Sequence, residues 1–167
     1  MRRTGICGAL ETLLVDKEIS NQAIPIFIEE LARAGCHLKG DEETVKIDNS
    51  IELALDTDWK TEYLEAILSI KIVDGVTGAI NHINKYSSNH TESIITEDKN
   101  TAETFLSKID SAIVMHNTST QFADGGEFGF GGEVGISTNT LPPRGHVGLE
   151  QLVSYKYEIS SKGKIRK

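Results

Sequence analysis

Cys7 is the residue in this sequence whose chemistry depends most on its neighbours. It lies in the segment TGICGALET, residues 4–12, where Gly5 and Gly8 allow the backbone to approach a ligand closely. We expect a short helix to begin just after the thiol. Free backbone N–H groups at the start of that helix would stabilise a thiolate and a developing oxyanion. The alternative is a small buried cysteine without a chemical role, and residue chemistry alone favours it.

The other residues with catalytic or metal-binding chemistry show no recognisable pattern. Cys36 precedes His37, but no further cysteine or histidine follows at the spacing of a zinc site, so we interpret it as structural. The remaining histidines lie in separate segments and form no metal signature: His82, His90, His116 and His146. The sequence also lacks the G-x-S-x-G elbow of serine hydrolases. We therefore predict no metal site.

Glycines cluster in residues 124–135, DGGEFGFGGEVG. Their spacing matches neither the G-x-G-x-x-G dinucleotide motif nor the P-loop. The wider stretch 117–148 has no hydrophobic periodicity, which in a compact domain is typical of a functional loop or of partner-dependent structure. We predict a tight loop over a substrate.

Strand-like and helical patterns alternate along the chain. The first strand is expected over residues 13–15, followed by a helix capped by Ser20 or Asn21 and ended by Gly35. Residues 39–58 are acidic and predict a connection with at most one short strand, at the alternation of residues 45–47.

Two more strand–helix units follow. Residues 68–72 alternate like a half-buried strand and feed a helix from Val76 to Ile83. The next strand is predicted at 93–96, with a helix capped by Asp98 or Asn100 and a further strand at 112–115. This alternation predicts an α/β fold with a mostly parallel sheet and flanking helices. Residues 153–159 alternate again, and such a strand could pair with another subunit.

Composition excludes several classes of function. The length of 167 residues suits one compact domain, and a net charge of −8 argues against a general nucleic-acid binder. The apolar runs are too short to span a membrane, which needs roughly 20 residues. Two cysteines in unlike contexts, without a secretory signal pattern, predict a reducing, cytoplasmic location.

Three blocks of the sequence resemble γ-glutamyl phosphate reductase, a family of the aldehyde dehydrogenase superfamily. They are residues 7–15, 73–94 and 124–152, and the most specific is AINHINKYSSNHTESI at 79–94. The resemblance implies an aldehyde dehydrogenase-like catalytic domain over residues 1–148. It also implies a carboxy-terminal segment, 149–167, with a strand for homo-oligomerisation, and no nicotinamide-binding domain in this chain.

The resemblance also implies a reaction. Cys7 would attack γ-glutamyl phosphate to form a thioester, which NADPH reduces to glutamate 5-semialdehyde, a proline precursor. Glu62 resembles the superfamily glutamate that holds the nicotinamide ribose. The residues expected near the substrate are His90, Thr91, Thr120 and Phe122, with the loop 119–128.

The sequence departs from the family at two places near the presumed site: Gly8 replaces the usual asparagine, and LPPRGH at 141–146, with Pro142 and Pro143, differs from the usual loop. Because the resemblance begins just before Cys7, turnover is expected to need a separate amino-terminal half that binds the cofactor. Two alternatives are a non-catalytic remnant serving as an interaction domain and a half-enzyme that forms the thioester without nicotinamide. A depressed Cys7 pKa would favour an intact site.

Overall fold

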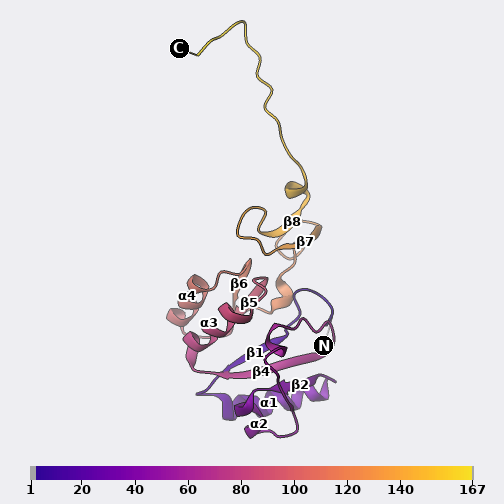
Figure 1. Ribbon diagram of the computed structural model, residues 1–167, viewed down its shortest axis with the longest axis vertical. Coiled ribbons are helices and arrows are strands. Elements are labelled where there is room, and N and C mark those ends of the chain that lie inside the picture. Colours follow the sequence, from indigo (N-terminus) through magenta and orange to yellow (C-terminus); the bar gives the residue numbers. More distant parts are fainter. Residues whose placement is uncertain (1–2, 167) are drawn as a thin grey trace.

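The structure is a computed structural model that describes residues 3–166 (Figure 1). Its helices are α1 (Ser20–Arg33), α2 (Glu42–Ile47), α3 (Gly75–Tyr86) and α4 (Lys99–Lys108), with 3-10 turns η1 (Asp58–Lys60), η2 (Thr120–Phe122) and η3 (Leu149–Leu152). Its strands are β1 (Thr12–Asp16), β2 (His37–Gly40), β3 (Glu52–Leu53), β4 (Ile67–Val73), β5 (Thr91–Ile94), β6 (Ile113–His116), β7 (Glu133–Ser137) and β8 (Gly145–Gly148).

The strands form three sheets. The largest has the order β1-β4-β2-β3 with every pairing parallel, and β5 pairs with β6 in parallel as well. β7 and β8 form an antiparallel hairpin. The predicted α/β class with mostly parallel strands is confirmed, although the parallel strands are divided between two sheets.

The main hydrophobic core lies between α1 and the four-stranded sheet. Ile24 and Ile28 of α1 are buried against strand residues such as Leu38, Leu68 and Ile70. The helix ends as predicted, since Gly35 has φ +81°. The predicted start is wrong, because α1 has Ile19 at its N-cap without a side-chain cap. Ser20 instead donates from its hydroxyl to the Lys17 carbonyl at 2.9 Å.

A second core joins α3 and α4. It centres on Ile80, Phe105 and Ile109, and residues of β5 and β6 pack against it. Asp98 caps α4 as predicted, because its carboxylate accepts from the Thr101 N–H at 3.0 Å and the Asn100 N–H at 3.3 Å.

The segment 39–58 contains more structure than the sequence predicted. Residues 45–47, expected as a strand, are the last three residues of α2. Asp41 explains the difference, since its carboxylate accepts from the Thr44 N–H at 2.9 Å and the Thr44 hydroxyl at 2.6 Å. This cap fixes a helix start that a short apolar alternation does not override. β2 and β3 flank the helix.

Residues 153–166 form neither helix nor strand and extend away from the body (Figure 1). The strand predicted at 153–159 is therefore not formed within the described chain, because a strand needs a neighbour to accept its backbone hydrogen bonds. Tyr155, Tyr157 and Ile159 are more than four-fifths exposed, at 83%, 82% and 92%. None of the helices in residues 3–166 is long and apolar enough to cross a membrane.

Truncating Phe105 tests the second core. Phe105 is 2% exposed, so Phe105→Ala should lower the free energy of unfolding by about 3 to 5 kcal/mol through lost burial and a residual cavity. The neighbouring Leu106 is 42% exposed, and Leu106→Ala should cost only about 0.5 kcal/mol. Urea denaturation followed by circular dichroism measures both, and equal effects would contradict the assigned core.

Candidate active site

Cys7 lies in a turn that precedes β1. The Ala9 N–H donates to the Ile6 carbonyl at 2.9 Å, and the chain then enters β1 at Thr12. The helix predicted just after the thiol does not form, because the extended β1 begins too soon for a helical turn to propagate. The backbone N–H groups of Cys7 and Gly8 nevertheless lower the pKa of the thiol, as donors close to the sulfur should.

The Cys7 turn opens onto a cavity of about 980 Å³. Among the residues that line it are Cys7, Glu62, His90, Thr91 and Thr120, which come from four separate segments. Phe122 is absent from the lining formed by the described residues, and its side chain is 48% exposed. The structure thus brings together five of the six residues expected from the sequence.

Thr120 fixes the Cys7 turn from the far end of the sequence. Its hydroxyl donates to the Gly8 carbonyl at 2.8 Å. Gly8 is buried, and a Cβ there would lie only 2.9 Å from the Thr120 carbonyl oxygen. A side chain at position 8, such as the family's asparagine, would therefore force these two backbones apart. Gly8 permits this close approach.

His90 and Thr91 enter the cavity where the chain passes from α3 to β5. His90 Nδ1 and the Thr91 hydroxyl are 2.7 Å apart and share a hydrogen bond. Burial lowers the pKa of His90, although the carboxylates of Glu133 and Glu62 oppose this. The His90 imidazole is therefore neutral at neutral pH and able to accept a proton.

The Cys7 thiol has a raised pKa, so the depressed value expected of an intact site is wrong for this chain. Partial burial raises it most, followed by the negative charge of Glu133 and, more weakly, of Glu62. The backbone N–H groups of Cys7 and Gly8 act in the opposite direction without offsetting these effects. The resting group is a thiol, which must lose a proton before it can act as a nucleophile.

Glu133 lies in the glycine cluster. The spacing of that cluster does not indicate that the Glu133 carboxylate raises the pKa of Cys7. The same carboxylate accepts from the Gly125 N–H at 3.0 Å and pairs with His146 Nδ1 at 2.7 Å, which closes the loop on itself. The glycines of this cluster do not line the Cys7 cavity within residues 3–166. Pro142 and Pro143 are exposed at the tip of the β7–β8 hairpin and also lie outside that lining.

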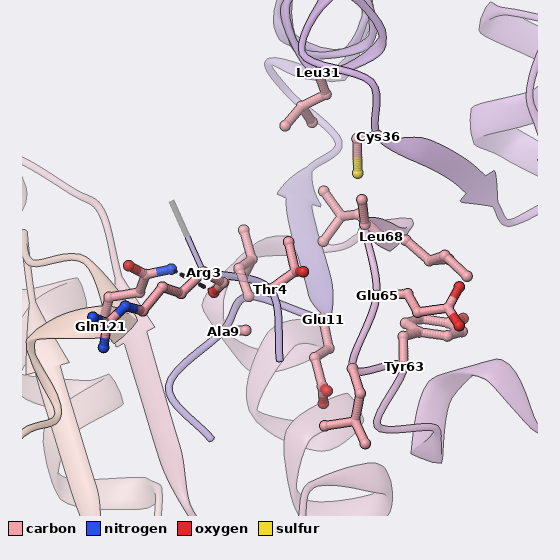
Figure 2. Close-up of a pocket in the computed structure, with 14 residues that line it drawn as sticks. Arg3, Thr4, Ala9, Glu11, Leu31, Cys36, Tyr63, Glu65, Leu68 and Gln121 are labelled. Carbon is pink, nitrogen blue, oxygen red and sulfur yellow. Dashed lines mark hydrogen bonds between the residues drawn. The ribbon is translucent and has the colours of Figure 1, made fainter. Parts of the chain in front are cut away.

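Glu11 is a second acid that the sequence analysis missed. Burial, then the negative charge of Glu62, raises the pKa of Glu11 to about 7, while the Tyr63 N–H lowers it. Glu11 also lines a smaller pocket of about 130 Å³ behind the Cys7 turn, where Figure 2 shows it near Tyr63. In the sequence, the feature that could have drawn attention to Glu11 is its place between Leu10 and Thr12, where an acid stands at the start of an apolar strand.

His82 is the most buried of the histidines predicted to have no special role. Its side chain lines the Cys7 cavity, and its ring contacts Trp59 of η1 edge-on at 5.4 Å and Tyr86 at 4.7 Å between centroids. Burial, with the positive charges of Lys71 and Lys85, lowers the pKa of His82 to about 4. The neutral ring joins α3 to the segment that precedes Glu62.

Cys36 packs beside the main core, as a structural cysteine should. Figure 2 shows its sulfur pointing toward Leu68, on the side of the small pocket away from Glu11. Burial raises the pKa of this thiol too. Within residues 3–166, no three histidine, cysteine or acidic side chains lie together as a metal site would require.

Thiol alkylation as a function of pH tests the electrostatics of Cys7. In a Cys36→Ser background, iodoacetamide should label Cys7 slowly near neutral pH and faster as pH rises through the raised pKa, because only the thiolate reacts. Glu133→Gln should shift this profile to lower pH by removing a negative charge. Glu103→Gln, on the exposed face of α4, serves as the control. A labelling rate already at its plateau at neutral pH would contradict the raised pKa.

Curated relatives of this chain are γ-glutamyl phosphate reductases. No protein-family model matches the chain. It is 52% identical to a γ-glutamyl phosphate reductase of Brucella suis and 54% identical to one of Hyphomonas neptunium, in each case over 99% of this chain and 39% of the relative. The chain thus spans about two-fifths of the length of these curated relatives.

The solved structures give the same result. The crystal structure of γ-glutamyl phosphate reductase from Thermotoga maritima superimposes with a TM-score of 0.93 at 45% identity, covering 99% of this chain and 40% of that one. An acetylating aldehyde dehydrogenase from Geobacillus thermoglucosidasius, 17% identical, matches with a TM-score of 0.61 over 96% of this chain and 46% of its own, which shows the aldehyde dehydrogenase-like fold. The chain is therefore homologous, along nearly its whole length, to part of γ-glutamyl phosphate reductase.

Proposed function

We propose that this chain carries the nucleophile of a γ-glutamyl phosphate reductase, which converts γ-glutamyl phosphate to glutamate 5-semialdehyde through a thioester on Cys7. One observation carries the proposal: residues from four segments meet at a single cavity with the cysteine at its edge. The homology to enzymes of that name supports the choice of substrate.

In the proposed acylation, the Cys7 sulfur attacks the acyl carbon of γ-glutamyl phosphate. The new S–C bond replaces the C–O bond to phosphate, and phosphate leaves with that electron pair. Because the resting Cys7 is a thiol, its proton must first be removed, and the neutral His90 imidazole on the same cavity is the proposed acceptor. The N–H groups of Cys7 and Gly8, which lower the pKa of the thiol, would stabilise the thiolate.

Thr91 and Thr120 provide hydroxyl groups at the same cavity, and we propose that they contact the substrate. Thr120 already donates to the Gly8 carbonyl, so its first contribution is to hold the Cys7 turn in place. Phe122 lies outside the lining formed by residues 3–166, and we propose no substrate contact for it.

Bound NADPH would supply the hydride that turns the thioester into the aldehyde. Glu62 is the group in this chain that fits the cofactor, since its carboxylate lines the Cys7 cavity and could accept hydrogen bonds from ribose hydroxyls. The glycine cluster does not contribute to this cavity. We propose that most of the nicotinamide-binding surface comes from outside these 167 residues, as a separate amino-terminal half would provide.

We also propose that residues 149–167 serve homo-oligomerisation while residues 1–148 carry the site. β8 ends at Gly148, and the extended tail presents Tyr155, Tyr157 and Ile159 to solvent. These alternate side chains fit a strand added to another copy's sheet edge.

Two free thiols support the proposed cytoplasmic setting.

The raised pKa of Cys7 and the exposed tail favour a second candidate, a non-catalytic interaction domain. Such a chain would associate through residues 153–159 and form no acyl intermediate. A third candidate is a half-enzyme that forms the thioester but does not reduce it. It would release phosphate once per Cys7 and oxidise no NADPH.

Complementation distinguishes these functions. The chain, mixed with the amino-terminal portion of a related reductase and γ-glutamyl phosphate generated in place, should oxidise NADPH, whereas neither portion alone should. Cys7→Ser should abolish the activity by removing the nucleophile, and Cys36→Ser should retain it. Absorbance at the NADPH band measures the rate. Equal activity of Cys7→Ser and wild type would rule out the proposed nucleophile.

A further inference from the structure

A buried hydrogen-bond network lies beside Glu62 and is centred on Asp58. Asp58 is 6% exposed, and its carboxylate accepts from the Lys39 ammonium at 2.9 Å, the Leu55 N–H at 2.7 Å and the Tyr63 hydroxyl at 2.9 Å. Three donors satisfy a charge that would otherwise be costly to bury. The network therefore anchors the segments that carry Lys39, Leu55 and Tyr63.

The protons in this network have one consistent arrangement. Tyr63 has a single hydroxyl proton, and the ionised Asp58 can only accept, so that proton lies between them. The Ser69 hydroxyl, 2.7 Å from the Tyr63 oxygen, must therefore donate to it. Ser69 is fully buried at 0% exposure and has no water to replace this bond.

Ser69 joins the two segments that meet at the cavity. Its backbone N–H donates to the Glu11 carbonyl at 3.0 Å, on the chain that continues from the Cys7 turn. Its hydroxyl bonds Tyr63, which directly follows Glu62 in the sequence. One buried residue thus connects the strand after the nucleophile to the segment that presents the proposed cofactor ligand.

The segment 61–66 needs such a tether. It lies between η1 and β4 in neither helix nor strand, and backbone hydrogen bonds hold its two ends, from the Thr61 N–H to the Asp58 carbonyl at 3.1 Å and from the His37 N–H to the Ala66 carbonyl at 2.8 Å. Leu64 within it has φ +57°, a left-handed conformation that is unfavourable for leucine. Glu62 itself is exposed, so packing of its own side chain does not hold it.

We propose that Tyr63 and Ser69 are positioning residues, whose shared hydrogen bond fixes the position of Glu62 relative to Cys7. That position determines how tightly Glu62 binds the cofactor ribose. This inference rests on the proposed function. It predicts that the Ser69 hydroxyl acts only through the Tyr63 oxygen, whereas the Tyr63 hydroxyl also bonds Asp58, so the Ser69 substitution should have no effect once the Tyr63 hydroxyl is removed.

A double-mutant cycle in the complemented enzyme tests the coupling. Tyr63→Phe and Ser69→Ala should each raise KM for NADPH about tenfold, as expected for the loss of a buried hydrogen bond. The double variant should be no worse than Tyr63→Phe alone, since that substitution already removes the Ser69 bond. Phosphate release from Cys7 acylation should keep its rate in all three. Thr44→Val, which loses a buried 2.6 Å bond from its hydroxyl to Asp41 outside the lining of the Cys7 cavity, is the control and should leave KM unchanged.

Hydrogen exchange on the full chain alone gives a readout independent of activity. The amides of residues 61–66 should exchange faster in Tyr63→Phe and Ser69→Ala, without further increase in the double variant, while those of α1 stay protected. Unchanged exchange at 61–66, or an unchanged or additive effect on KM in an active mixture, would overturn the positioning role. A wild-type mixture that oxidises no NADPH would instead overturn the proposed function.

Discussion

The parallel pairing of β1 with β4 is the constraint on which the rest of the site depends. Parallel strands begin at the same edge of a sheet, so the segments that precede them lie together. The Cys7 turn precedes β1, and the Glu62 segment precedes β4. The register that pairs Thr12 with Ser69 therefore sets how far apart the nucleophile and the proposed cofactor ligand lie. His90 lies just before β5, which belongs to the separate β5–β6 sheet, so the β1–β4 register does not position it.

Contacts over long sequence distances then fix what the strands bring together. Thr120, which follows β6, holds the Cys7 turn through the Gly8 carbonyl, and the absence of a side chain at Gly8 allows that approach. The carboxylates of Glu62 and Glu133 act on the same thiol through their charge. Partial burial raises the pKa of Cys7 most and these two charges add to it, so the resting residue is a thiol although the geometry of the site is already formed. In this account, a proton acceptor at the cavity controls when acylation begins.

Hydrophobic periodicity was enough to predict the strand–helix alternation, because α1, α3 and α4 each bury one apolar face and Gly35 ends α1 in the conformation that glycine favours. It failed at α2, where the side chain of Asp41 decides the structure and the apolar alternation does not. The strand expected at residues 153–159 needs a partner edge, which one chain cannot supply. Sequence patterns describe local preference, and these two failures depend on hydrogen bonds to specific partners.

The sequence predicted which residues come together better than it predicted their electrostatics. The fold gathers at one cavity five of the six residues that the family resemblance implied, and it leaves Phe122 outside the lining. The raised pKa of Cys7 was not predictable, because Glu133 is far from it in sequence and near it only through the β7–β8 hairpin. The same holds for Glu11, whose pKa depends on Glu62.

The intact mass of the chain after exposure to γ-glutamyl phosphate tests whether Cys7 is the nucleophile. We expect a gain of one γ-glutamyl group, located at Cys7 by peptide mapping, released by hydroxylamine as a thioester should be and absent from Cys7→Ser. An unchanged mass under conditions that support NADPH oxidation in the complemented mixture, or an acyl group on Cys36, would contradict it.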